Sequence, residues 1–90
     1  LIMQKRLIDH WMSQGVTFIS PLSVYLERDV KIGRDTVVYP FVSITGKSVI
    51  GENVEIGPGS FIKDAVIEDG EIIPGGSRVI GNIKKRKENV

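Results

Sequence analysis

The chain has 90 residues, which is enough for one small domain with a single core. It contains no cysteine, so disulfides, thiolate metal sites and cysteine nucleophiles are excluded, and we expect a cytoplasmic protein. The net charge is +1, but Lys84–Lys87 and Glu88 hold four positive charges and one negative charge, so residues 1–83 carry −2. This mildly acidic body argues against a nucleic-acid surface, and no apolar run approaches the length of a membrane span. We expect neither nucleic acid nor membrane as a partner.

Residues 1–15 are predicted to form a linker helix. Apolar side chains recur there at three- and four-residue spacing, the pattern of an amphipathic helix: Met3, Leu7, Ile8, Trp11 and Met12. Gly15 is the predicted end of the helix, because glycine adopts the left-handed conformation without penalty. The apolar stripe needs a surface to cover. Since the chain begins Leu-Ile-Met inside this pattern, we expect it to be a fragment of a longer protein.

The next segment, residues 16–23, is predicted to be an irregular link. Phe18, Ile19 and Leu22 are its large apolar residues. We expect these three side chains to seal the open end of the structure that follows.

Beyond the link, an aliphatic residue stands at every sixth position, with a single five-residue step between Ile62 and Ile67. The ladder consists of Leu26, Ile32, Val38, Ile44, Ile50, Ile56, Ile62, Ile67, Ile73 and Val79. No α-helix buries a period of six, whereas hexapeptide repeats are the signature of a parallel β-helix. The sequence therefore predicts an all-β fold for residues 16–83, a left-handed parallel β-helix of about three coils, preceded by one α-helix.

A second inward position stands two residues before each member of the ladder. Its occupants are small or β-branched with one exception: Val24, Val30, Thr36, Val42, Ser48, Val54, Ser60, Ala65, Glu71 and Ser77. The exception is Glu71, which would need a partner or a shifted pKa if it pointed inward. We favour a strand that drifts and lets this carboxylate reach solvent.

Three hexads close one triangular coil, so residues eighteen apart are predicted to stack, as in Leu26–Ile44–Ile62. The five-residue step is one event, after which the register continues. Residues 84–90 are predicted to be a basic tail, which we interpret as solvated.

Several segments match a known enzyme family in the same order. They are Trp11-Met12-Ser13-Gln14-Gly15-Val16-Thr17-Phe18, Pro21, Ile32-Gly33-Arg34-Asp35-Thr36-Val37-Val38-Tyr39-Pro40, Lys47-Ser48-Val49-Ile50-Gly51-Glu52-Asn53 and Ile56-Gly57-Pro58-Gly59-Ser60. Over about residues 1–73 the chain resembles the linker helix and first coils of the bifunctional N-acetylglucosamine-1-phosphate uridylyltransferase/glucosamine-1-phosphate acetyltransferase family. Residues 73–82 depart from it and resemble the closing turn of many hexapeptide-repeat proteins.

The resemblance implies a role in making a sugar nucleotide for the cell wall. In that family a nucleotidyltransferase domain, upstream of the coils, transfers a uridylyl group from UTP to N-acetylglucosamine 1-phosphate with Mg²⁺. The resemblance also implies a homotrimer formed through β-helix faces. The uridylyltransferase residues would lie before Leu1, so the cofactor belongs to the parent enzyme and none is expected in this chain.

No catalytic, cofactor-binding or metal-binding residue is predicted within the chain. Hexapeptide acyltransferases resemble one another in using a histidine base, but His10 lies in the predicted helix, and we interpret it as a partly exposed helix residue. The runs Gly57-Pro58-Gly59-Ser60 and Gly75-Gly76-Ser77 do not lead into a helix, so we interpret them as turns rather than phosphate loops.

Acidic residues gather after Ile62: Asp64, Glu68, Asp69 and Glu71. Paired carboxylates can bind a divalent cation or act as acid and base. We favour the alternative, an exposed and charged corner where the repeat is shortened.

The favoured function is an assembly domain of a sugar-nucleotide-synthesising enzyme. The alternatives are a small acetyl-CoA-dependent acyltransferase, which would need a base other than histidine, and a stand-alone scaffolding module. Outward apolar residues are expected in pairs on three different faces of the coil: Tyr25 with Phe61, Val37 with Ile72, and Val49 with Val66. The sequence leaves open which face associates.

Overall fold

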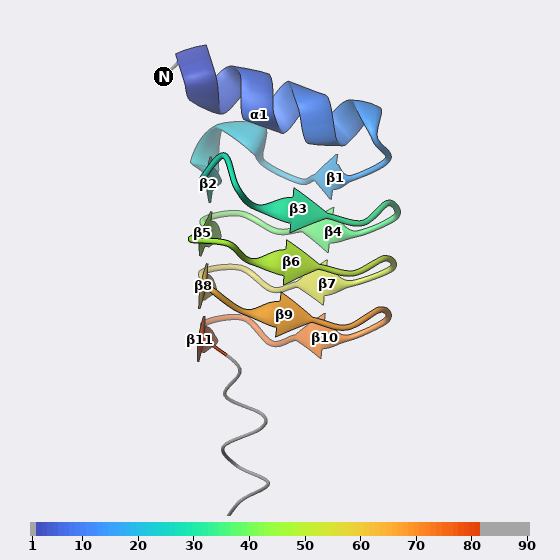
Figure 1. The fold of residues 1–90 in the computed structure, drawn as a ribbon, viewed down its shortest axis with the longest axis vertical. Coiled ribbons are helices and arrows are strands. Elements are labelled where there is room, and N and C mark those ends of the chain that lie inside the picture. The colour runs from blue at the N-terminus through green and yellow to red at the C-terminus, as the bar shows by residue number, and fades with distance from the viewer. Residues whose placement is uncertain (1, 82–90) are drawn as a thin grey trace, which may run out of the picture.

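The computed structural model describes residues 2–81 of the chain. The helix α1 (Ile2–Ser13) lies across the end of a stack of short strands, and a 3-10 helix, η1, spans Pro21–Ser23 (Figure 1). The strands are β1 (Thr17–Phe18), β2 (Tyr25–Leu26), β3 (Lys31–Ile32), β4 (Val37–Val38), β5 (Ser43–Thr45), β6 (Val49–Ile50), β7 (Glu55–Ile56), β8 (Phe61–Lys63), β9 (Val66–Ile67), β10 (Ile72–Ile73) and β11 (Arg78–Ile80). The predicted basic tail and the predicted domain end at residue 83 lie outside the described residues.

The strands form three parallel sheets that make the faces of a prism. Face A is β1-β4-β7-β10, face B is β2-β5-β8-β11 and face C is β3-β6-β9. Three complete coils, β2–β4, β5–β7 and β8–β10, are flanked by β1 before and β11 after. This six-residue repeat in parallel coils is the predicted left-handed β-helix, so the prediction of the fold class is confirmed.

The predicted internal ladders are confirmed by the strand register. Leu26 pairs with Ile44, which pairs with Ile62, and Ile50 pairs with Ile67 across the shortened step. The ladder residues from Leu26 to Ile73 are 0–8% exposed, because alternate side chains of each strand point into the prism. Their burial is the main driving force of the fold.

Buried hydroxyl groups occupy three of the second inward positions and connect adjacent coils. The Ser48 hydroxyl donates to the carbonyl oxygen of Thr45 at 2.9 Å and accepts the N–H of Ala65 at 3.1 Å. Thr36 and Ser60 are likewise buried and donate to backbone carbonyls. A buried polar group is tolerated only when it is hydrogen-bonded, and these three meet that condition.

The link differs from the prediction. Thr17 and Phe18 form strand β1, which pairs with Val37 and Val38 of β4, so the segment is not wholly irregular. Phe18 is buried as expected, but Ile19 is 53% exposed and Leu22 is 101% exposed, so the prediction that these two seal the coil was wrong. Their place over the first coil is taken by α1.

The helix packs on the coil through one side. Ile8 is buried, and Leu7 and Trp11 are half-buried against the core, whereas Met12 is 40% exposed, contrary to its predicted place in the stripe. Met12 lies in the last turn of α1. The side chain of Met3 lies outside the described residues. No helix within residues 2–81 has the length and apolar character needed to cross a membrane.

Candidate functional site

Charge is distributed unequally over the three edges where the faces meet. The segments joining face A to face B, residues 19–24, 39–42, 57–60 and 74–77, contain no charged residue. We call this the proline edge, because all four prolines of the chain lie in it. The other two edges carry the charges of the corner segments: Glu27, Arg28, Asp29, Lys47 and Asp64 between faces B and C, and Arg34, Asp35, Glu52, Glu68, Asp69 and Glu71 between faces C and A.

The predicted acidic cluster is divided between those two charged edges. Its carboxylates accept backbone N–H groups of the neighbouring coil: Asp64 Oδ1 from Lys47 at 2.9 Å and Asp69 Oδ1 from Glu52 at 2.8 Å. No group of three or more His, Asp or Glu side chains within residues 2–81 is arranged to hold a metal ion. Asp64 and Asp69 are exposed, and each satisfies a backbone donor at its corner.

Glu71 departs from the inward pattern of its column. It is half-buried, whereas Val54, which precedes it by one coil, is fully buried. Its Oε1 accepts the N–H of Glu68 at 2.8 Å across the corner turn. The carboxylate thus caps its own turn instead of entering the core.

His10 stands on the exposed side of α1. Its ring packs edge-on against Trp11, with 4.6 Å between the ring centroids. No carboxylate or hydroxyl bonds to its ring among the residues that the structure describes. The arrangement offers none of the partners that orient a histidine base.

Both glycine-containing runs are corners of the coil. Gly59 and Gly76 have φ values of 75° and 76°, and each donates its N–H to the carbonyl of a residue one coil above, Pro40 and Pro58 respectively. Neither run precedes a helix within the described residues. The turn interpretation accounts for them fully.

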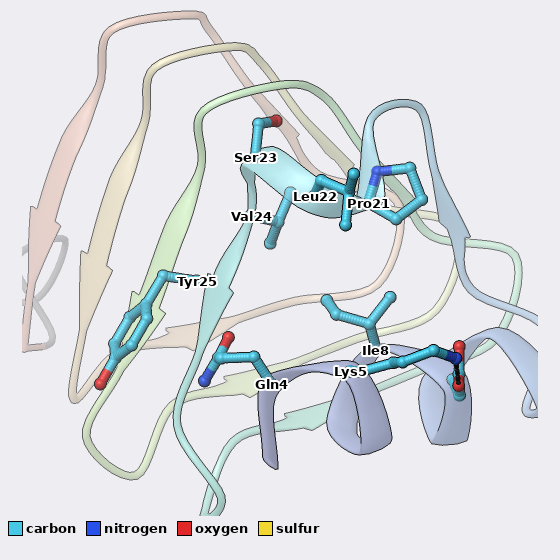
Figure 2. A pocket seen from close by; sticks show the side chains of 9 residues that line it. Gln4, Lys5, Ile8, Pro21, Leu22, Ser23, Val24 and Tyr25 are labelled. Carbon is cyan, nitrogen blue, oxygen red and sulfur yellow. Dashed lines mark hydrogen bonds and ion pairs between the residues drawn. The ribbon is translucent and has the colours of Figure 1, made fainter. Parts of the chain in front are cut away.

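A pocket of about 640 Å³ lies between α1 and the segment that enters β2 (Figure 2). Ile8 and Val24 point into it, and Lys5 and Asp9 form an ion pair of 2.7 Å at its rim. Gln4, which also lines the pocket, bonds through its side chain to the backbone of Leu26. The surface of the pocket is mostly apolar.

Phe41 is the unusual residue of the proline edge. Its φ of 62° is left-handed. In the lower coils the residues at the same corner, Gly59 and Gly76, adopt this conformation. The side chain is 73% exposed, and its N–H donates to Ser23 Oγ one coil above, beside the fully exposed Leu22. A bulky residue with positive φ is strained, and such strain concentrates at functional positions.

The fold and these features define a hexapeptide-repeat β-helix protein. The family described as bacterial transferase hexapeptide (six repeats) matches residues 29–64. The resemblance to the bifunctional enzyme family is also confirmed. The chain is 46% identical to the bifunctional protein GlmU of Exiguobacterium sibiricum over 71 residues, which are 79% of this chain and 16% of that protein.

Other relatives carry the same name. The bifunctional protein GlmU of a Geobacillus species is 50% identical over 72 residues, 80% of this chain and 16% of its own length. That of a Synechococcus species is 48% identical over 66 residues, 73% of this chain and 15% of its own length. The chain thus spans about one sixth of the length of the curated relatives it matches.

Sequence reasoning paired the outward apolar residues correctly but missed the proline edge. Strand pairing places Tyr25 and Phe61 on face B, Val37 and Ile72 on face A, and Val49 and Val66 on face C. The signal for the edge was present in the sequence, because Pro40 and Pro58 are one coil apart and no charged residue lies in the four connecting segments.

Proposed function

We propose that this chain is an assembly domain of a sugar-nucleotide-synthesising enzyme of the GlmU type. The observation that carries the proposal is the combination of a β-helix with a helix seated on its first coil, in a chain 46–50% identical to bifunctional GlmU proteins over 71–72 residues. The parent enzyme would carry a nucleotidyltransferase domain before the linker helix. That domain would transfer a uridylyl group from UTP to N-acetylglucosamine 1-phosphate, and the protein would act in the cytoplasm in cell-wall precursor synthesis.

In this proposal the chain itself performs no chemistry. Within residues 2–81 the ring of His10 packs on Trp11, and no hydrogen bond joins it to a carboxylate or hydroxyl, while the acidic side chains of Asp64 and Asp69 accept backbone N–H groups. The Mg²⁺ of the parent reaction has no fitting donor set among the described residues. We therefore assign the cation and the reacting groups to the upstream domain.

The contribution of the chain would be to bring subunits together as a homotrimer. A β-helix presents flat faces of fixed length, and a threefold assembly of such prisms buries the same surface on every subunit. Exposed apolar side chains available for this contact include Leu22, Tyr25, Phe41 and Ile72.

The experiment that tests the proposal has two parts. Sedimentation velocity of the 90-residue chain should show a species of about 30 kDa, because each chain has a mass of 10.0 kDa. The native gene product, isolated from source cells with an antibody to this domain, should transfer uridylyl groups with UTP and Mg²⁺. A native product of only 90 residues without this activity would contradict the proposal.

The chief alternative is a small acyltransferase that uses acetyl-CoA. It is tested on the isolated chain with acetyl-CoA and glucosamine 1-phosphate, for which we expect no turnover. Turnover that is abolished in His10→Gln would establish a base in the helix and overturn the non-catalytic assignment. A stand-alone scaffolding module would instead be indicated by a native product of this length that captures another protein.

A further inference from the structure

The proline edge differs from the other two edges of the prism because its connecting segments carry no charged residue. A rotation axis parallel to the long axis of the β-helix places the same residue of each copy at the same height along that axis. At the other two edges such an approach would set like charges against one another, for example Glu52 against Glu52, or Lys47 against Lys47. The segments of the proline edge contain no charge to repel a second copy.

Large apolar side chains project from the upper half of this edge. Leu22 is 101% exposed and Phe41 is 73% exposed, and the hydrogen bond from Phe41 N–H to Ser23 Oγ places the two corners on adjacent coils. On either side of the edge, Ile19 of the link is 53% exposed and Tyr25 of β2 is 47% exposed. Large apolar side chains exposed in one region of a surface mark interaction sites.

The lower half of the edge carries glycines in place of these side chains. Gly59, one coil below Phe41, and Gly76, two coils below it, occupy the same corner. A Cβ at Gly76 would meet no atom of its own chain within 4 Å, so the space outside this corner is open. Arg78, which follows the last segment of the edge, has its guanidinium carbon 5.1 Å from the centroid of the Phe61 ring.

We propose that the proline edge faces the symmetry axis of the assembly, where Leu22 and Phe41 of each copy pack against those of the next. This proposal rests on the proposed function, and it specifies the surface through which the subunits associate. A second copy is the favoured occupant for two reasons. It carries the same axial repeat of about 4.8 Å, so contacts match level by level, and the surface is uncharged where identical groups meet.

The test uses variants that leave the fold of each subunit intact. Phe41→Gly removes the aromatic ring and supplies the residue that the lower coils use at this corner. Phe41→Asp places like charges around the axis, and Asp is accepted at positive φ elsewhere in the chain, at Asp35 and Asp64. We expect both variants to keep the urea midpoint of the monomer or raise it, and to weaken association by about tenfold or more in sedimentation equilibrium.

The matched control is Val66→Asp on face C, where the wild-type side chain is 53% exposed. It should leave association unchanged. A second measurement exploits the absence of cysteine: Leu22→Cys should form a disulfide between subunits under mild oxidation, while Val66→Cys should not.

The outcomes separate this proposal from the proposed function. If the wild-type chain associates, but Val66→Asp dissociates it and Phe41→Asp does not, the proline edge is the wrong surface and the assembly function stands. If the wild-type chain remains monomeric at every concentration, both are overturned.

Discussion

The side-chain amide of Gln4 makes with Leu26 the two hydrogen bonds that a neighbouring strand would make. Leu26 N–H donates to Gln4 Oε1 at 3.0 Å, and Gln4 Nε2 donates to the carbonyl oxygen of Leu26. Leu26 belongs to β2, the first strand of face B, which has β5 on one side and no strand on the other within the described residues. One helical side chain therefore closes a sheet edge that would otherwise be open to pairing.

From this arrangement we predict that Gln4→Ala lowers the free energy of unfolding by about 1–3 kcal/mol, because it leaves both partly buried backbone groups of Leu26 unpaired. Gln4→Glu should cost less than Gln4→Ala, since the carboxylate still accepts the Leu26 N–H and only the bond to the Leu26 carbonyl is lost. Urea denaturation followed by circular dichroism measures the change. The control is Gln14→Ala at an exposed position, and an equal effect of the two alanine substitutions would contradict the assigned role.

A second prediction concerns the close approach of adjacent coils at Gly33. A Cβ built there would lie 2.6 Å from the carbonyl carbon of Gly51 in the coil below, and backbone at that distance must shift. Gly33→Ala should therefore destabilise the fold by about 1–3 kcal/mol or more through overpacking.

Gly76→Ala supplies the comparison for this steric effect. That position has a φ of 76° but no atom within 4 Å of an added Cβ, so only backbone strain of about 1–2 kcal/mol opposes the substitution. Thermal unfolding should rank Gly33→Ala as the less stable variant. The reverse order would show that adjacent coils can move apart at Gly33 without a loss of stability.

A third prediction concerns Asp64, which contributes both a left-handed backbone conformation and a side-chain hydrogen bond at the shortened corner. Its φ is 50°, and its carboxylate accepts the Lys47 N–H. Asp64→Asn retains an acceptor and tolerates positive φ, so we expect a change below about 1 kcal/mol. Asp64→Ala loses both advantages and should cost about 2–3 kcal/mol, whereas Asp64→Gly loses only the cap and should fall between them.

Chemical denaturation of the three Asp64 variants under one condition measures this series. Equal stability of the glycine and alanine variants would remove backbone strain from the explanation. Equal stability of the asparagine and glycine variants would show that the hydrogen bond from the Lys47 N–H to the side chain at position 64 does not contribute to stability.

The regular part of the fold was predictable because one physical constraint repeats. Each strand buries one ladder aliphatic at intervals set by the coil, so the period of six defines both the strands and their stacking, from Leu26 to Ile73. The five-residue step was also predictable, since the register on either side of Ile62 and Ile67 is continuous.

The ends of the fold were not predictable from that period. β1 pairs Thr17 with Val37, an offset of twenty residues, because η1 occupies the intervening link. Ile19 and Leu22 are apolar like core residues, but the inward positions over the first coil are already filled by α1. A contact such as that between Gln4 and Leu26 depends on where the helix docks, which a local pattern does not specify.

The five-residue step has a consequence for how such a chain can change over generations. One residue is missing at a single corner, yet the strands before and after it keep their partners, with Ile44 on Ile62 and Ile50 on Ile67. Asp64 supplies from its side chain the acceptor that faces Lys47 at this shortened corner. Insertions and deletions at the corners can therefore accumulate one at a time, so that the outline of the prism diverges between lineages while its interior stays in register.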